Sequence, residues 1–263
     1  MDFSQYNIKF KLFGIPICIM PSFWILCIFF SPFMSMKTDA DRPWLCGVAG
    51  WIMALLLSFL IHELGHALTA RKFFRVSPDI AFGVGRSPDG ASVFGGVTTW
   101  RRSETTHATS KRRALVSAAG PCAALAAAIL ALGVAFLTGA RSFSYHLEFG
   151  VLPVVYPHEW VVKTGEVGAA DLFLGYFSLG FFWINFFWSV VNLLPIYPLD
   201  GGQIMMAFAK NARGVRNTFY VSIACAILVG GLFLSEGSWF ASIFFFYMGL
   251  VNFSAARAYE RTF

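Results

Sequence analysis

Long, nearly uninterrupted apolar runs dominate the order of hydrophobic and polar residues along this chain. Each run reaches or approaches the ~20 residues that a helix needs to cross a hydrocarbon core ~30 Å thick. The helices of a soluble protein would need polar faces, and residues 114–137 show almost none. The pattern therefore predicts an all-α polytopic membrane protein with about six transmembrane helices. They cover roughly residues 17–34, 46–70, 114–139, 171–199, 217–234 and 238–256.

The connection between the second and third predicted helices, residues 73–112, has a different pattern. Runs of β-favouring residues at 80–84 and 91–100 flank a Ser-Pro-Asp-Gly tract at 87–90. This tract predicts a turn, because proline presets one backbone dihedral angle and glycine admits a positive one. Since the runs are too apolar for a simple solvated loop, we expect a small membrane-associated β-hairpin. A polar cytoplasmic loop is the alternative.

The connection between the third and fourth predicted helices, residues 140–170, is rich in aromatic and acidic residues. Aromatic side chains with polar tips suit the boundary between lipid and water, so we expect this segment to follow the outer membrane surface. No stretch has the composition of a soluble domain, a repeat or a linker. Residues 1–263 are therefore expected to form a single integral-membrane domain.

Composition and charge placement agree with this membrane topology. The chain is 57% hydrophobic and 13% charged, with a mean hydropathy of +0.64, whereas soluble domains carry about 25% charged residues. The basic residues behind the net charge of +6 concentrate near both termini, at 71–113 and at 210–216. Because cytoplasmic connections are enriched in Lys and Arg, both termini are predicted to be cytoplasmic. The charge therefore indicates topology, and no nucleic-acid partner is expected.

Candidate chemistry begins with His62-Glu63-Leu64-Gly65-His66 near the inner end of the second predicted helix. Residues four apart share a helix face, so both imidazoles can bind one metal ion, while Glu63 can reach a water molecule on that ion. An ionisable residue inside a spanning helix costs about 2.5–3.5 kcal/mol and usually lines a functional cavity. The pattern predicts His62 and His66 as zinc ligands and Glu63 as the catalytic base.

A catalytic zinc ion prefers three protein ligands and keeps one position for water. The candidate third ligand is Asp200, at the inner end of the fourth predicted helix. The second and fourth helices run in the same direction in the predicted topology, so their inner ends lie at similar depth. Pro195 and Pro198 interrupt the helix there, and irregular backbone at membrane depth is tolerated where it lines a cavity.

The two motifs together resemble those of the site-2 protease family of intramembrane zinc metalloproteases. They are the pentad at 62–66 and Asn192-x-x-Pro195-x-x-x-x-Asp200-Gly201. The resemblance implies one Zn2+ per chain, held by His62, His66 and Asp200. It also implies a transmembrane protein substrate that is cleaved in or near its spanning segment, in regulated intramembrane proteolysis.

The resemblance assigns further residues. It implies that Asn192 contacts the substrate or the developing oxyanion, although a polar side chain in a spanning helix also commonly bonds to a neighbouring helix. The tract Phe94-Gly95-Gly96-Val97 is similar to the family's membrane-associated β-loop. We expect this tract to bind substrate by strand addition.

The chain departs from many family members in two ways. It reads Gly120-Pro121-Cys122-Ala123-Ala124 where relatives carry an Asn after Gly-Pro, and no PDZ or CBS module fits its length. Two other interpretations are a membrane metal transporter and an inactive family member that acts as a scaffold. A transporter would not need Glu63 beside the first histidine and would require further ligands along a path.

Overall fold

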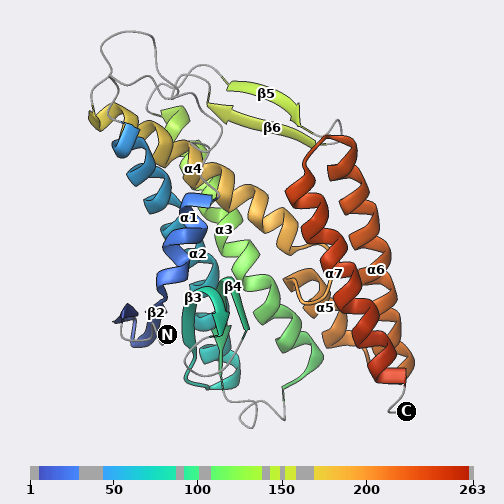
Figure 1. Ribbon diagram of the computed structural model, residues 1–263. Coiled ribbons are helices and arrows are strands. Elements are labelled where there is room, and N and C mark those ends of the chain that lie inside the picture. Colours follow the sequence, from blue (N-terminus) through green and yellow to red (C-terminus); the bar gives the residue numbers. More distant parts are fainter. Residues whose placement is uncertain are drawn as a thin grey trace.

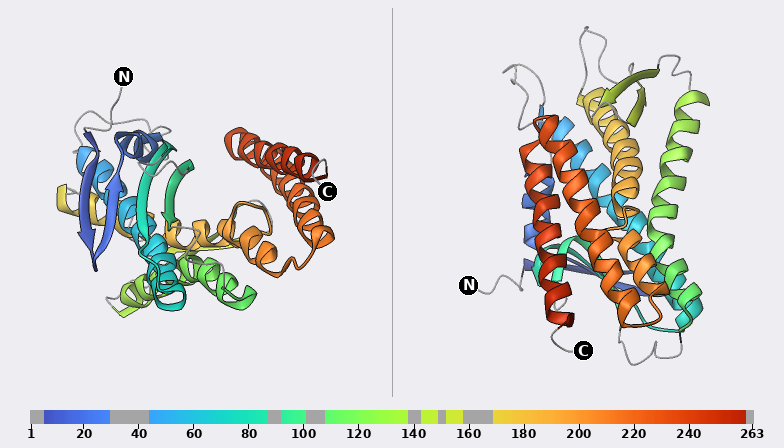
Figure 2. Two further views of the ribbon diagram at one scale, coloured as in Figure 1. Left: turned by 90° about the horizontal axis from the view of Figure 1, so that it is seen from below. Right: turned by 90° about the vertical axis from the view of Figure 1, so that its right-hand side faces the viewer.

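The computed structural model describes residues 6–29, 44–86, 92–100, 108–137, 143–148, 152–157 and 169–260. Within these ranges the chain is mostly helical. A four-stranded sheet lies toward one end of the helices and a two-stranded sheet lies at the other end (Figure 1). The N and C ends of the chain both lie toward the end with the four-stranded sheet, as a second view also shows (Figure 2).

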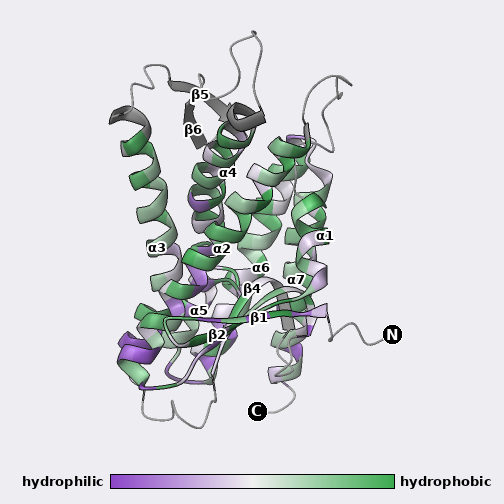
Figure 3. Cartoon of the chain, turned by 90° about the vertical axis from the view of Figure 1, so that its left-hand side faces the viewer, coloured by the Kyte–Doolittle hydropathy of each residue, from purple (hydrophilic) through white to green (hydrophobic). Residues whose placement is uncertain are grey.

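Helices form most of the described chain. They are α1 (Pro21–Phe29), α2 (Trp44–Phe74), α3 (Ser110–Leu137), α4 (Ala169–Asn192), α5 (Asp200–Phe208), α6 (Ala212–Ser235) and α7 (Trp239–Glu260). Four segments are long and apolar enough to cross a membrane, namely Leu45–Phe74, Ser110–Val134, Ala212–Ser235 and Trp239–Glu260. Hydrophobic residues cover most of the length of these helices, and hydrophilic ones gather at the end of α3 near the four-stranded sheet (Figure 3).

The four-stranded sheet has the order β1-β2-β3-β4. Its strands are β1 (Ile8–Leu12), β2 (Ile15–Ile19), β3 (Asp79–Arg86) and β4 (Ser92–Thr99). β3 and β4 pair antiparallel between α2 and α3, where the sequence predicts a hairpin, while β2 pairs parallel with β3. The structure therefore has a larger sheet than an isolated hairpin. The second sheet consists of β5 (Phe143–Glu148) and β6 (Leu152–Pro157), which lie within the connection at 140–170.

The prediction of the first helix is wrong at its start. Residues 17–19 belong to β2, and the helix begins only at Pro21. Every second residue of β2 is a buried isoleucine. β-Branched residues at a spacing of two favour a strand with one face in the core, whereas average hydrophobicity does not separate a strand from a helix. Residues 30–34 of the predicted helix lie outside the described residues.

The fourth predicted helix is too long at its inner end. α4 ends at Asn192, and residues 193–199 form turns that contain Pro195 and Pro198. Asp200 is consequently the first residue of a separate short helix, α5, and not the end of the spanning helix. The prolines explain the break, because a proline in a helix interior removes a backbone hydrogen bond and clashes with the preceding turn.

The two largest buried hydrophobic clusters among the described residues organise the helices. The first joins the sheet to α1 and α2 through residues such as Phe23, Phe59 and Phe82. The second joins the turns after α4 to α6 and α7 and includes the fully buried Ile196. Figure 2 shows the pair α6 and α7 set apart from the sheet and α1, with α5 on the side of α6.

Candidate metal centre

Three buried side chains that are able to hold a metal ion meet where α2 and α5 approach each other. His62 and His66 share one face of α2 because they are four residues apart. Asp200 comes from the first turn of α5. The ligand atoms of the three residues lie within 4.8 Å of one another. The structure thus brings together the three residues that the sequence predicts as ligands.

The separations between these atoms fit a small tetrahedral ion. His62 Nε2 lies 3.1 Å from His66 Nε2. The Asp200 carboxylate places Oδ2 3.2 Å from His62 Nε2 and Oδ1 3.3 Å from His66 Nε2. A tetrahedral zinc ion with bonds of about 2.0–2.1 Å separates its ligand atoms by about 3.3 Å. Asp200 Oδ2 is also buried without a hydrogen bond among the described residues, so it has a free lone pair for such an ion.

The ring of His66 is oriented by α3. Its Nδ1 lies 2.7 Å from the carbonyl oxygen of Val116. A carbonyl only accepts, so Nδ1 carries the proton and neutral His66 has its Nε2 lone pair free. One turn later on α3, a Cβ at Gly120 would collide with His66 Nε2. The glycine of the Gly120-Pro121 pair therefore leaves the space that this ring occupies.

Glu63 faces the sheet. Its Oε2 accepts a hydrogen bond of 2.6 Å from the Thr98 hydroxyl of β4, which also lies 3.1 Å from the Glu63 backbone carbonyl. A Cβ at Gly96 would lie 2.8 Å from Glu63 Oε1, closer than real Cβ contacts. β4 therefore approaches the carboxylate directly, and the absence of a side chain at Gly96 permits this approach.

Asn192 is buried in the last turn of α4. Its Nδ2 donates to the Trp188 carbonyl of its own helix at 2.9 Å. A hydrogen bond to a neighbouring helix was the alternative role considered for Asn192. Asn185, two turns earlier on α4, makes a bond of this kind: its Nδ2 donates to Ser58 Oγ of α2 at 2.7 Å. The role of Asn192 toward a substrate stays a prediction.

The tract Phe94-Gly95-Gly96-Val97 lies on β4, at the edge of the four-stranded sheet. Gly96 faces Glu63, as described above, and Val97 packs against Met20 and Ala81. The position of β4 beside the carboxylate is compatible with the expected substrate contact, which stays a prediction.

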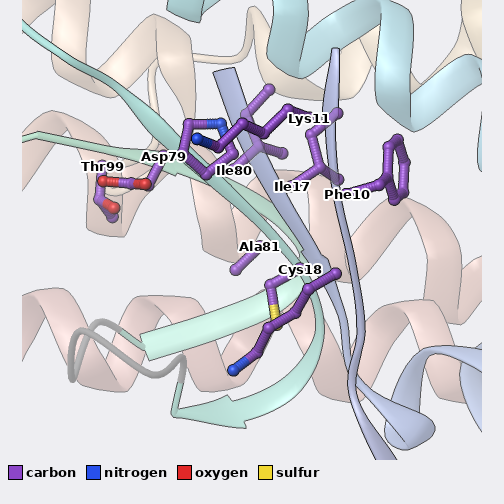
Figure 4. A pocket seen from close by; sticks show the side chains of 10 residues that line it. Phe10, Lys11, Ile17, Cys18, Asp79, Ile80, Ala81 and Thr99 are labelled. Atoms are coloured by element: carbon purple, nitrogen blue, oxygen red, sulfur yellow. The ribbon is translucent and has the colours of Figure 1, made fainter. Parts of the chain in front are cut away.

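An open pocket lies elsewhere, on the four-stranded sheet (Figure 4). It has a volume of about 530 Å3, and none of the residues that line it belongs to the metal group. The lining residues are Lys9, Phe10, Lys11, Pro16, Ile17, Cys18, Asp79, Ile80, Ala81 and Thr99. The candidate metal centre, in contrast, is buried between helices.

Three residues that shape the centre were not predicted from the sequence. Val116 and Gly120 orient His66, and Thr98 binds Glu63. The Gly-Pro pair on α3 marked Gly120 in the sequence. The packing of α3 on α2 was needed to show that this glycine leaves room for the His66 ring. Nothing in the sequence distinguishes Thr98 from its neighbour Thr99.

Comparison with known proteins identifies the family. The model of peptidase family M50 matches residues 50–234. The chain is 27% identical over 223 residues to "Putative zinc metalloprotease sll0528" of Synechocystis, covering 82% of this chain and 48% of the relative. It is 30% identical over 218 residues to "Putative zinc metalloprotease Rip3" of Mycobacterium tuberculosis, covering 75% of this chain and 45% of the relative. The chain thus spans about half the length of these relatives.

A solved structure has the same fold. It is the site-2 protease from Methanocaldococcus jannaschii, with a TM-score of 0.53, 19% identity and coverage of 95% of both chains. The resemblance to the site-2 protease family is confirmed by these matches. With the four apolar helices, they establish a multi-pass membrane protein.

Proposed function

The chain belongs to peptidase family M50, and on this basis we propose that it is a zinc-dependent intramembrane protease. It hydrolyses peptide bonds in or near the transmembrane segments of other membrane proteins, in regulated intramembrane proteolysis. The observation that carries this proposal is the convergence of His62, His66 and Asp200, with Glu63 beside the first ligand on α2.

Each residue of the centre has a proposed role. His62 and His66, through Nε2, and Asp200, through its carboxylate, hold one zinc ion. When bound, zinc polarises the scissile carbonyl and lowers the pKa of a water molecule toward ~7. Glu63 accepts a proton from the attacking water and passes it to the leaving amine. Thr98 holds Oε2 of Glu63, which leaves Oε1 for the proton transfer.

Asn192 and β4 are proposed to bind the substrate. Asn192 contacts the substrate or the developing oxyanion from the last turn of α4. A substrate helix hides its peptide bonds in hydrogen bonds, so it must unwind before cleavage. β4 is the outer strand of the sheet and pairs with β3 alone among the described strands. An unwound segment can therefore add to β4 through backbone hydrogen bonds, close to Glu63.

The proposed topology has six spanning helices within a single domain of residues 1–263. Besides the four apolar segments, the helices that contain α1 and α4 complete the proposed six, and both chain termini are proposed to lie in the cytoplasm. The basic residues Arg71, Lys72 and Arg257 occupy the last turns of α2 and α7, and Lys111 is the second residue of α3. This enrichment toward one end of the helices favours a cytoplasmic location for that end.

Cleavage by purified protein tests the proposal. A membrane-protein substrate in detergent should be cut by the wild-type chain, while Glu63→Gln should bind zinc normally and show no cleavage, since a base is removed but no ligand. Metal analysis of both proteins provides the control. Loss of zinc from Glu63→Gln, or cleavage at the wild-type rate by that variant, would contradict the assignment of Glu63.

A further inference from the structure

The turns at 193–199, which lead from α4 to Asp200, pack against α6 and α7. Ile196 is fully buried, and with Leu199 it belongs to the core formed with Ala226 of α6 and Phe245 of α7. Neither α6 nor α7 contributes a ligand or the proposed base. They approach the metal centre through this short connection and through the packing of α6 on α5.

Polar contacts fix one residue of the connection, Tyr197, from both sides. Ser222 of α6 accepts a hydrogen bond of 2.9 Å from the Tyr197 backbone N–H and donates its own hydrogen to the Thr218 carbonyl. Asn252 of α7 donates from Nδ2 to the Tyr197 carbonyl and to the Met248 carbonyl. Ser222 and Asn252 are 0% and 1% exposed. A buried backbone group costs about 1–3 kcal/mol when its partner is lost, so these contacts restrict where Tyr197 can lie.

The path from Tyr197 to Asp200 is short and tightly packed. Only Pro198 and Leu199 lie between them. A Cβ at Gly202 would collide with the backbone N of Tyr197, and one at Gly201 would collide with the Leu193 carbonyl. The first turn of α5 thus packs directly on the connection, and a shift of Tyr197 displaces the backbone of Asp200.

We propose that α6 and α7 position the third metal ligand, with Ser222 and Asn252 acting as a clamp on the Tyr197 backbone that fixes the Asp200 carboxylate opposite His62 and His66. This inference deepens the proposed function and rests on it. It assigns Ser222 and Asn252 as positioning residues for metal binding, although neither reaches the metal group. Two helices without catalytic residues then determine the affinity for zinc.

The chain offers a matched control for the clamp. Ser242 of α7 is as buried as Ser222, and its Oγ donates to the Gly230 carbonyl of α6 at 2.6 Å. Ser222→Ala and Ser242→Ala therefore each remove one buried hydroxyl from these two helices. Only Ser222→Ala removes a hydrogen bond to the Tyr197 backbone. Asn252→Leu provides a second clamp variant of similar size.

The experiment uses the protein of residues 1–263 in detergent. The zinc dissociation constant is measured by competition with a chromophoric chelator, the unfolding temperature is measured without metal, and the absorption spectrum is measured with Co2+ in place of zinc. We expect Ser222→Ala and Asn252→Leu to weaken zinc binding by about 10–100-fold, the range for residues that orient metal ligands. Their Co2+ spectra should shift toward that of Asp200→Ala. Ser242→Ala should keep the wild-type affinity and spectrum, with an unfolding temperature lowered as in Ser222→Ala.

Wild-type zinc affinity in Ser222→Ala would overturn the clamp, and so would an equal loss of affinity in Ser242→Ala. If Asn252→Leu does not fold, Ser222→Ala alone decides the question. A wild-type protein that binds neither zinc nor Co2+ would refute the proposed function itself, so the two failures are distinguishable.

Discussion

Gly120→Ala tests how α3 holds His66. The added methyl group would occupy the space of His66 Nε2, while the Val116 carbonyl, one turn earlier, holds Nδ1 at 2.7 Å. The substitution introduces no polar group, and alanine favours a helix more than glycine does. Its expected effect therefore comes from the position of the ring and not from loss of α3.

The size of the effect follows from the geometry. A Cβ at Gly120 would lie 2.2 Å from His66 Nε2, and non-bonded atoms prefer a separation of about 3.5–4.0 Å, so the ring would have to retreat by roughly 1.3–1.8 Å. Zinc ligand distances tolerate deviations of only about 0.2 Å. Retreat also breaks the bond to Val116, which orients Nε2. The loss should at least equal that of a lost orienting partner, about 10–100-fold in zinc affinity, which corresponds to about 1.4–2.7 kcal/mol.

Chelator competition in detergent measures this change, and Gly133→Ala is the matched control. Gly133 is on the same helix, and apart from its chain neighbours and the nearby backbone of α3 no described atom lies within 4 Å of the position that its Cβ would take. Gly133→Ala should bind zinc as the wild type does. If Gly120→Ala also kept the wild-type affinity, His66 would not be held against α3 as a zinc ligand, and the reasoning would be refuted.

Three further predictions follow from the centre and the topology. Asp200→Ala should lower both zinc content and cleavage, and full zinc content by metal analysis would place the third ligand elsewhere. Thr98→Val removes a hydrogen bond to a carboxylate worth about 1.5–3 kcal/mol, so kcat should fall about tenfold or more with zinc content unchanged; an unaltered kcat would exclude a positioning role for this bond. On intact cells, an impermeant thiol reagent should label single cysteines introduced outside the membrane, at positions 40 and 165, and spare cytoplasmic ones, at positions 89 and 211. Labelling of position 89 with protection of position 165 would invert the topology.

The parts of the centre that could be predicted from the sequence depend on local geometry. His62 and His66 share a face through the helical repeat alone, so no knowledge of the tertiary structure was needed to pair them. Asp200 was predicted as their partner from the common depth of two helix ends. The structure brings it to the same place, but on a separate helix, because Pro195 and Pro198 end α4 earlier.

The remaining parts depend on contacts between distant segments. β2 pairs with β3 across the whole of α1 and α2, so residues 17–19, which were predicted as the start of a helix, belong to a strand of the sheet. Thr98 reaches Glu63 over 35 residues, and Asn252 reaches Tyr197 over 55 residues. No periodicity in the sequence reports such contacts, because each depends on how complete elements pack.

X-ray absorption at the zinc edge of the purified wild-type protein, together with the zinc content per chain, would reveal which side chains bind the metal. We expect one zinc ion per chain, with nitrogen and oxygen donors at about 2.0–2.2 Å that include two imidazoles. The five cysteines of the chain provide a clear alternative, because sulfur ligands lie at about 2.3 Å. A first shell that contains sulfur, or one without imidazole, would contradict a zinc site built from His62, His66 and Asp200.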